Sequence, residues 1–228
     1  MIQMLDLAAI MLSRFPALLA ADGKNVMLGI LALALGYALG SISFGIIIPR
    51  ILGGTQDIRT VGSGNAGTTN VLRTQGKKQA LLVLIGDVCK GMLGAWLGAL
   101  ILPGLWGSAI AGIGTVMGHS FPLYFNLKGG KGVATGVGAL LVMSPQIGST
   151  ALLVFILVVL MTRWVSLGSI LGAASLIPLC WLFEAPMAVV FYSYFMAAFV
   201  IWRHRSNIKK LLTGTESKLG EFRKEGKQ

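Results

Sequence analysis

The sequence predicts an all-α protein, a polytopic bundle of helices in a membrane, and three observations support this prediction. Of 228 residues, 55% are hydrophobic and only 12% are charged, compared with about 25% charged residues in soluble domains. Glycine occurs 31 times, and glycine is commoner in transmembrane helices than in soluble ones. The apolar residues gather in runs of about 20, the length that a bilayer requires. These features exclude a soluble globule, a disordered chain and a coiled coil.

The apolar runs define the expected spans in chain order. Residues 26–48 carry no charge and end at Pro49-Arg50, which makes them the clearest span. The next runs contain polar residues, because 80–102 encloses Asp87 and Lys90 and 105–125 encloses His119. The remaining apolar runs cover residues 133–161, 165–183 and 187–202.

The run at 133–161 fits either one long tilted helix or two short helices that break at Ser144-Pro145, because proline disfavours helix at the preceding residue. Cytoplasmic loops are enriched in Lys and Arg. With the break, the chain has seven transmembrane helices, and 16 of the 19 basic residues lie on the cytoplasmic side, whereas Arg14 and Lys24 lie outside and Lys90 lies within a span. A single helix would move Arg163 and the basic tail outside. The charge bias therefore favours seven spans, with the N-terminus outside and the C-terminus cytoplasmic.

The spans divide the chain into three parts. Residues 26–202 form the membrane domain, and residues 203–228 form a basic cytoplasmic tail whose segment 206–212 suits a short amphipathic helix on the membrane surface. Residues 1–25 fit poorly, because charges and a proline interrupt their apolar run and no basic segment precedes it as in a signal peptide. We interpret them as an N-terminal extension, either an interfacial segment or the product of a start codon upstream of Met27.

The net charge of +11 lies between the apolar runs. In that setting it indicates membrane orientation and attraction for anionic lipids or substrates, and not binding to nucleic acid. The two cysteines, Cys89 and Cys180, lie in separate apolar stretches and predict no disulfide framework. The histidines and cysteines also lack metal-ligand spacing, so we expect neither a metal nor a cofactor.

The loop after the first span is rich in glycine and polar residues. Its core, residues 61–73, reads VGSGNAGTTNVLR. Small residues let backbone amides approach a ligand, and Arg59 and Arg73 can bind phosphate in bidentate fashion. A linker that merely turns the chain has no use for two arginines and several polar donors, so we favour anion binding. The neutral donors are Ser63, Asn65, Thr68, Thr69 and Asn70.

A second glycine-rich segment, 128–132 (KGGKG), follows the third span. Glycines on both sides of Lys131 free the backbone to wrap a phosphate, and the next helix offers its positive N-terminus. The segment lacks the spacing of a Walker A motif. A short basic turn that follows the positive-inside rule is the alternative.

Four polar residues near later span ends have two possible roles each. Ser166 and Ser169 share a helix face, and serines there often only hydrogen-bond the helix end. His204 and Asn207, three apart beyond the last span, fit either a polar ligand or lipid head-groups. No His-x4-Asp pair of the kind that many acyltransferases use is present, and neither is a G-x-S-x-G elbow.

Two charged residues and a histidine lie inside the spans. Asp87 and Lys90 are i,i+3 neighbours, and we leave open whether they form a functional intramembrane site or a mutually neutralising structural pair. For His119 we expect a helix-packing role, so that its replacement by alanine alters stability and not chemistry.

Taken together, these motifs resemble the signatures of the bacterial acyl-phosphate:glycerol-3-phosphate acyltransferases, in the right order from about residue 26 to about residue 218. The family usually has proline where this chain has Ser43. The matching segments are 40–45 (GSISFG), 57–59 (DIR), 61–73 (VGSGNAGTTNVLR), 119–122 (HSFP), 128–135 (KGGKGVAT), 165–167 (VSL) with Ser169, 203–208 (RHRSNI) and 211–216 (LLTGTE).

The resemblance implies a seven-span enzyme of the bacterial inner membrane whose active site faces the cytoplasm. Such an enzyme transfers a fatty acyl group from acyl phosphate to the 1-hydroxyl of glycerol 3-phosphate, giving lysophosphatidic acid and phosphate in phospholipid synthesis. It uses no metal, acyl-CoA or acyl-carrier protein, and a partner phosphate acyltransferase supplies the donor. A transporter or channel for a phosphorylated metabolite is the alternative, although the glycine loops lie on one face only.

The resemblance also implies roles for individual residues. Ser63, Arg73 and Lys131 would contact the phosphates and the reacting carbonyl, and Glu216 would anchor the tail structurally. The expected substrate-binding residues are Gly62, Gly64, Asn65, Thr68, Gly129, Gly130, Gly132, Ser166, Ser169, His204 and Asn207.

Overall fold

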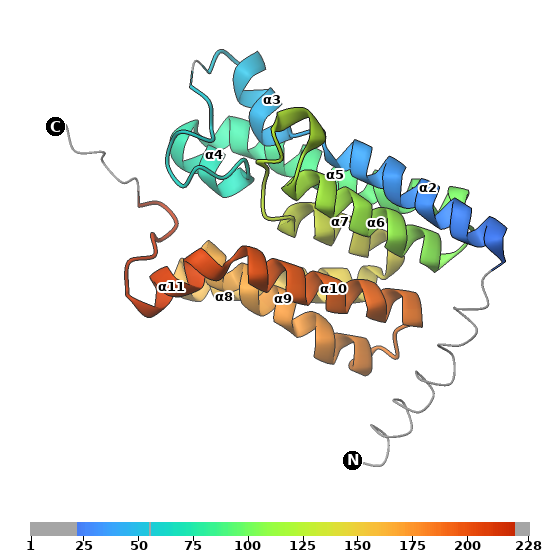
Figure 1. Ribbon diagram of the computed structural model, residues 1–228. Helices are drawn as coiled ribbons and strands as arrows, with labels where there is room; N and C mark the ends of the chain where they lie inside the picture. Colours follow the sequence, from blue (N-terminus) through green and yellow to red (C-terminus); the bar gives the residue numbers. More distant parts are fainter. Residues whose placement is uncertain (1–21, 55, 222–228) are drawn as a thin grey trace.

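The computed structural model describes residues 22–54 and 56–221, and every regular element in these ranges is a helix (Figure 1). The helices are α2 (Gly23–Gly40), α3 (Phe44–Ile51), α4 (Thr68–Thr74), α5 (Lys77–Ile101), α6 (Leu105–Ser120), the 3-10 turn η1 (Leu123–Phe125), α7 (Val133–Met143), α8 (Pro145–Thr162), α9 (Val165–Leu182), α10 (Met187–Arg203) and α11 (Arg205–Leu212). The long helices alternate in direction; short connections join α5 to α6, α7 to α8, α8 to α9 and α9 to α10, whereas longer polar segments precede α5 and α7.

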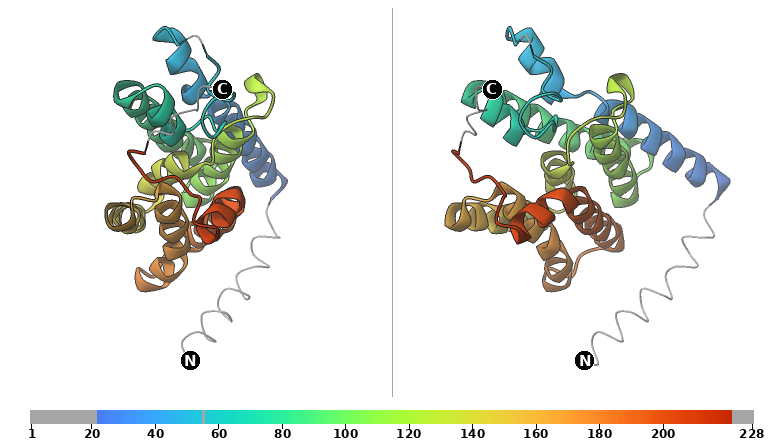
Figure 2. Two further views of the ribbon diagram at one scale, coloured as in Figure 1. Left: turned by 90° about the vertical axis from the view of Figure 1, so that its left-hand side faces the viewer. Right: turned by 60° about the vertical axis from the view of Figure 1, so that its left-hand side comes forward.

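The bundle consists of two packed groups of helices. Helices α2, α5, α6 and α7 form one group, and α8, α9 and α10 form the other (Figures 1 and 2). Helix α10 joins them by packing on α6 and α7. At this junction the fully buried Tyr192 donates its hydroxyl hydrogen bond to the carbonyl oxygen of Gly136, at 3.0 Å. The phenol thus satisfies its polar group within an apolar core.

Small residues bring α2 and α6 into unusually close contact. The buried face of α2 consists of Gly29, Ala32, Gly36 and Gly40. A Cβ on Gly36 would collide with the carbonyl of Ala111 in α6. Glycine allows two helix backbones to approach this closely. In lipid the hydrophobic effect does not drive helices together, so the close van der Waals contacts stabilise the pair instead. Much of the glycine excess therefore serves helix packing.

Four helical segments are long and apolar enough to cross a membrane: 23–51, counted through a break, and α5, α8 and α9. A fifth results if α10 and α11, bent by 57° at their junction, count as one. Helix α6, with 16 residues, and α7, with 11, fall below that length. The expected ranges at 80–102, 165–183 and 187–202 correspond closely to α5, α9 and α10.

The first expected span, 26–48, is not one continuous helix. It breaks at Ser41–Ser43, between α2 and α3. Ser41 Oγ donates to the carbonyl of Tyr37 at 2.8 Å and accepts the Leu123 N–H at 3.1 Å. Lys90 Nζ in α5 donates to the freed carbonyl of Ile42, at 2.8 Å. These partners satisfy backbone and side-chain groups that a broken helix in a membrane would otherwise leave exposed to hydrocarbon.

The third expected span, 105–125, is also too long, because α6 ends at Ser120. Pro122 follows two residues later and cannot continue the helix. The hydroxyl of Tyr37 donates to the carbonyl of Phe121, at 2.7 Å, and holds the departing chain against α2.

The break expected at Ser144-Pro145 is confirmed. Helix α7 ends at Met143, Ser144 is extended with φ −153°, and Pro145 opens α8. Proline suits this first helical position, because its missing N–H would have no partner there in any case.

The polar connections gather at one end of the bundle, where α3, α4 and α11 lie in Figure 1. The chain beyond α11 folds back onto this end, since Leu219 N–H donates to the Arg163 carbonyl at 2.7 Å and Arg163 Nη2 donates to the Leu219 carbonyl at 2.8 Å. The short helix expected at 206–212 is α11. Most of the expected N-terminal extension, residues 1–21, lies outside the described residues.

Candidate active site at the polar end of the bundle

The first loop folds around the side chain of Asn70, which is 1% exposed. Its Nδ2 donates to the carbonyls of Ile58 and Val61, each at 3.0 Å, and its Oδ1 accepts the N–H of Ser63 at 2.9 Å. Gly62 adopts φ +60° beside it, a conformation that favours glycine. We expected Asn70 to be a donor to an anion, but it instead fixes the path of the loop.

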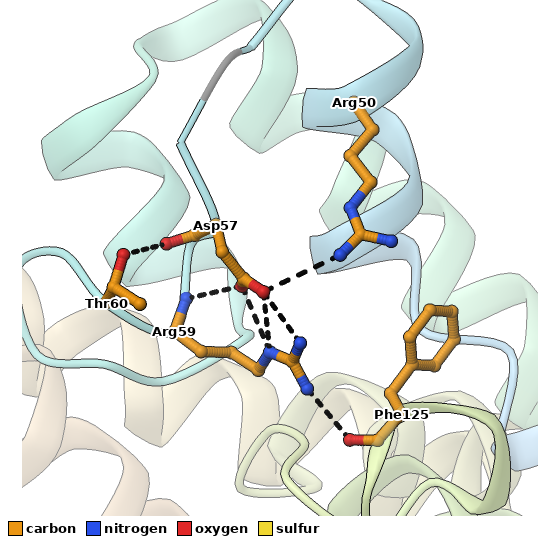
Figure 3. A network of polar contacts seen from close by, with 5 residues as sticks. All are labelled: Arg50, Asp57, Arg59, Thr60 and Phe125. Atoms are coloured by element: carbon orange, nitrogen blue, oxygen red, sulfur yellow. Dashed lines mark hydrogen bonds and ion pairs between the residues drawn. The ribbon is translucent and has the colours of Figure 1, made fainter.

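Arg59 links the first loop to the second (Figure 3). Its Nη2 lies 2.6 Å from Oδ2 of Asp57 and its Nε lies 3.0 Å from Oδ1, while Nη1 donates to the carbonyl of Phe125 at 2.9 Å. Arg50 approaches the same carboxylate at 3.6 Å. The Arg59 guanidinium lowers the pKa of Asp57 to about 2, mainly by hydrogen bonding. The bidentate face that we expected to bind phosphate is therefore already occupied by Asp57.

Lys131 lies in the second loop, just before α7, and is partly buried. Its Nζ is 2.5 Å from Oδ1 of Asn207, whose Nδ2 donates to Glu216 Oε1 at 2.8 Å. Burial lowers the pKa of Lys131 to about 8; the negative charge of Glu216 opposes this shift, and the positive charge of Arg203 reinforces it. Lys131 is thus a largely buried amine at the wall of the site, where a nearby anion would favour its charged form.

Arg73 at the end of α4 reaches the folded-back tail. Its Nη2 donates to the carbonyl of Ser217 at 2.9 Å, whereas its buried Nε has no hydrogen-bond partner among the described residues. Two buried hydroxyl oxygens of expected site residues, Thr68 Oγ1 and Ser166 Oγ, likewise have no hydrogen-bond partner among the residues that the structure describes. Buried polar atoms are normally paired, so each unpaired atom calls for an explanation such as a ligand or a water molecule.

The side chains of His204 and Ser169 form hydrogen bonds with backbone carbonyls one helical turn earlier in the chain. Nδ1 of His204 lies 2.8 Å from the carbonyl of Val200, and a carbonyl only accepts, so Nδ1 carries the hydrogen. Burial and the charge of Lys131 lower the pKa of His204 to about 4, which leaves the imidazole neutral at pH 7. Ser169 Oγ donates to the Val165 carbonyl at 2.9 Å, the structural role that serines at helix ends often have.

An open pocket of about 370 Å³ lies where the first loop, the second loop and the α10–α11 junction meet. Its wall contains five basic side chains and, among the described residues, no acidic one, so it attracts anions. The lining residues are Arg59, Ser63, Gly64, Asn65, Leu127, Lys128, Gly129, Lys131, Arg203, Arg205 and Ser206.

The pocket brings together only part of the expected site. Six of the expected residues line it: Arg59, whose guanidinium is paired with Asp57, and Ser63, Gly64, Asn65, Gly129 and Lys131. The remaining expected residues do not line it: Gly62, Thr68, Thr69, Asn70, Arg73, Gly130, Gly132, Ser166, Ser169, His204, Asn207 and Glu216. Asn207 and Glu216 nevertheless connect to the pocket through Lys131.

Sequence reasoning missed Arg203 as a site residue. Its Nη2 donates to the carbonyl of Gly130 at 2.8 Å, and its guanidinium lies 5.1 Å from the ring centre of Phe121. The signal was available, because Arg203 opens a basic run directly after the last apolar span. Arg205 and Ser206 of the same run also line the pocket, as does Lys128, which opens the second glycine-rich segment.

A bundle of apolar helices with a basic pocket at its polar end defines a class, the polytopic membrane proteins that bind an anionic molecule near the bilayer surface. Among the described residues, no group of three or more His, Cys, Asp or Glu is placed to hold a metal ion.

The family follows from comparison with known proteins. The family model described as glycerol-3-phosphate acyltransferase matches residues 30–214. The glycerol-3-phosphate acyltransferase of Thermoanaerobacter pseudethanolicus is 42% identical over 195 residues, 86% of this chain and 98% of that protein. That of Clostridioides difficile is 43% identical over 197 residues, 84% and 96% of the two chains. This chain belongs to the glycerol-3-phosphate acyltransferase family and is an integral membrane acyltransferase.

Solved structures agree with this assignment. The crystal structure of the integral membrane glycerol 3-phosphate acyltransferase PlsY in its glycerol 3-phosphate form has a TM-score of 0.77 and 40% sequence identity, and the match covers 87% of this chain and 96% of that one. The lysophosphatidic acid form gives a TM-score of 0.76 and 39% identity. Multi-pass membrane architecture is therefore common to this chain and its solved relatives.

Proposed function

We propose that this enzyme transfers a fatty acyl group from acyl phosphate to the 1-hydroxyl of glycerol 3-phosphate, giving lysophosphatidic acid and phosphate in phospholipid synthesis. The observation that carries the proposal is the pocket with five basic side chains, since both substrates are phosphates. The solved relative's two forms, with glycerol 3-phosphate and with lysophosphatidic acid, match an acceptor and its product. The family resemblance supplies the donor.

The chemical step breaks one bond and forms another at the acyl carbonyl. The hydroxyl oxygen of glycerol 3-phosphate attacks the carbonyl carbon, and the bond from that carbon to the phosphate oxygen breaks. Phosphate leaves with the electron pair, and one of its oxygens takes the hydroxyl proton. Because acyl phosphate already has a good leaving group, orientation and charge stabilisation supply much of the acceleration. No metal or cofactor is needed for this step.

The roles proposed for the catalytic residues follow their positions. Lys131 and Ser63 in the pocket wall contact phosphate and stabilise the charge that develops on the carbonyl oxygen. Arg73 acts from the adjacent helix α4, and its unpaired Nε supports contact with a ligand. The backbone amides of the two glycine loops add donors for phosphate; the glycines concerned are Gly62, Gly64, Gly129, Gly130 and Gly132.

The remaining site residues bind glycerol phosphate or shape its site. Asn65 lies in the pocket wall, and Thr68 and Ser166 offer buried hydroxyls that lack another partner. Ser169, His204 and Asn207 complete the acceptor site. Glu216 has a structural role that its hydrogen bond from Asn207 supports.

We also propose a topology and a location. Helices α2, α5, α6, α7, α8, α9 and α10 make seven passes, with the N-terminus outside, the C-terminus cytoplasmic and the pocket facing the cytoplasm of a bacterial inner membrane. The gathering of the basic loops at one end of the bundle supports this orientation. Residues 26–202 then form the catalytic membrane domain, residues 203–228 a basic cytoplasmic tail, and residues 1–25 an extension. A partner phosphate acyltransferase supplies the acyl phosphate.

The test uses the full-length purified protein in detergent or lipid cubic phase. Palmitoyl phosphate and glycerol 3-phosphate are added, and phosphate release and lysophosphatidic acid are measured, with palmitoyl-CoA as the control donor. We expect phosphate release that requires both palmitoyl phosphate and glycerol 3-phosphate. With palmitoyl-CoA as the donor, we expect no palmitoyl transfer. A folded, monodisperse sample that shows no transfer would overturn the proposal and favour an anion transporter.

Two variants test the site in the same assay. Lys131→Ala and Arg73→Ala each remove a phosphate ligand, so we expect loss of transfer from a folded, membrane-inserted protein. Lys24→Ala, an exposed lysine at the opposite end of α2, is the matched control and keeps wild-type turnover. Near-normal turnover of Lys131→Ala or Arg73→Ala would remove that residue from the active site.

A further inference from the structure

Three ionisable side chains form a buried cluster outside the pocket. Asp87 and Lys90 in α5 and His119 in α6 are 1%, 3% and 4% exposed. Lys90 Nζ lies 2.9 Å from Oδ1 of Asp87, and Nδ1 of His119 lies 3.4 Å from the same oxygen without forming a well-aligned hydrogen bond. Polar groups at membrane depth are expensive and are kept mainly for function.

Stability alone does not account for this cluster. Replacement of a buried ion pair by apolar residues of similar volume is often neutral or stabilising, because the pair loses about as much hydration as it gains in attraction. A role in holding nearby segments in place is the alternative, and the contacts of Lys90 and His119 identify those segments.

Lys90 holds the break between α2 and α3. Its ammonium donates to the carbonyl of Ile42 at 2.8 Å and lies 5.6 Å from the ring centre of Phe44. The carbonyl of Ile42 lies in the break, outside any regular helix. In the same break, Ser41 Oγ accepts the hydrogen bond of the Leu123 N–H. The break therefore also supports the start of the second loop.

His119 forms the floor of the glycine turn that precedes Lys131. The three atoms nearest to a Cβ built on Gly130 all belong to the His119 ring, and the closest, Nε2, would collide with it. The N–H of Gly130 donates to the carbonyl of His119 at 3.1 Å, and the carbonyl of Gly130 accepts from Arg203. A shift of the imidazole therefore moves the turn and, with it, two basic residues of the pocket.

We infer that Asp87, Lys90 and His119 are positioning residues, which hold the Gly129–Gly130 turn so that Lys131 and Arg203 point correctly into the pocket; for His119 this role replaces the purely helix-packing role expected from the sequence. Asp87 fixes the His119 ring from one side, and the glycine turn lies against the other. This inference rests on the proposed function, because it assumes that Lys131 binds a substrate phosphate.

The first test measures steady-state kinetics of Asp87→Asn and His119→Ala with acyl phosphate and glycerol 3-phosphate. Misplacement of a binding group by about 1 Å can cost about 100-fold in rate, so we expect kcat/KM for glycerol 3-phosphate to fall roughly 10- to 100-fold, with a raised KM. Thr115→Val is the matched control. Thr115 is also buried in α6, but within the described part of the chain its hydroxyl bonds only to the carbonyl of Ala111, so we expect unchanged kinetics.

A double substitution separates positioning from folding. Asp87→Leu combined with Lys90→Met removes both charges together and leaves apolar side chains of similar length, so no buried charge stays unpaired, although the Lys90 bond to Ile42 is lost. We expect a folded protein whose melting temperature falls only modestly, by the loss of that one hydrogen bond, and a kcat/KM as low as that of Asp87→Asn. Wild-type kinetics in this folded variant would overturn the inference.

The contact between His119 and Gly130 provides a second test by coupling. Gly130→Ala alone forces its methyl group into the imidazole and lowers kcat/KM. In the His119→Ala background that methyl group has room, so we expect the double variant to be no worse than Gly130→Ala. Losses that simply multiply would show that the ring does not set the turn.

Lys131→Ala, assayed in parallel, distinguishes the two possible failures. If Lys131→Ala remains active, the proposed site is wrong. If Lys131→Ala is inactive while Asp87→Asn and His119→Ala keep wild-type kcat/KM, the site stands and only the positioning role fails.

Discussion

At the scale of residues, Lys131 connects the burial of the site to its pH dependence. Its pKa of about 8 means that the ammonium form, which attracts phosphate, is present below that pH and is lost as the pH rises through it. Because kcat/KM reports the free enzyme, we expect kcat/KM for glycerol 3-phosphate to fall above about pH 8. A pH–rate profile between pH 7 and 10 measures this.

Lys131→Arg tests whether the fall in kcat/KM above about pH 8 is due to Lys131. A guanidinium stays protonated throughout the range, so we expect the alkaline decline to disappear in this variant, even if its activity is lower. An unchanged decline near pH 8 would assign the titration to another group.

The chemistry of the polar loops was predictable residue by residue, but their pairing was not. The sequence places Ser63, Asn65 and Lys131 in segments that favour phosphate, and all three line one pocket. The sequence does not reveal that Arg59 is neutralised by Asp57, because an arginine in this loop could equally bind phosphate or pair with a neighbouring carboxylate. That choice depends on the loop folding around Asn70, so that Arg59 also reaches Phe125.

At the scale of elements, the contact between α2 and α6 predicts the effect of filling its glycines. Gly36→Val would force a side chain against the carbonyl of Ala111, and overpacking of this kind costs about 1–3 kcal/mol. We expect a lower unfolding temperature in detergent. Gly29→Ala is the control, because the nearest atom to its Cβ, Ile110 Cδ1, is 3.6 Å away and forms an ordinary contact. Equal stability of the two variants would contradict the close approach of these helices.

Helix positions were predictable where the cause is local and not where it is distant. Apolar runs and Pro145 determine α5, α9 and the break before α8 within their own segments. The break between α2 and α3 depends instead on Lys90, 48 positions from the carbonyl of Ile42 that it satisfies. No local pattern in residues 26–48 carries that information, which is why a continuous helix was expected there.

At the scale of the whole molecule, the alternating helices predict opposite locations for two exposed positions. In a background without cysteine, Asp22→Cys at the start of α2 and Thr213→Cys after α11 are labelled with a membrane-impermeant maleimide. With seven passes, we expect intact spheroplasts to be labelled at position 22 only, and position 213 to react after permeabilisation. Labelling of both from the same side would contradict an odd number of passes.

The pocket lies where the two polar loops meet the α10–α11 junction, and not halfway along the helices. In the proposed reaction, a water-soluble acceptor and a lipid-soluble donor would then meet without either leaving its own phase. The acyl chain would stay in the leaflet where the donor dissolved, and the new phosphate headgroup would emerge among its neighbours. Donor, acceptor and product would all meet at a single face of the bilayer, so the proposed reaction requires neither a channel nor a flipping step.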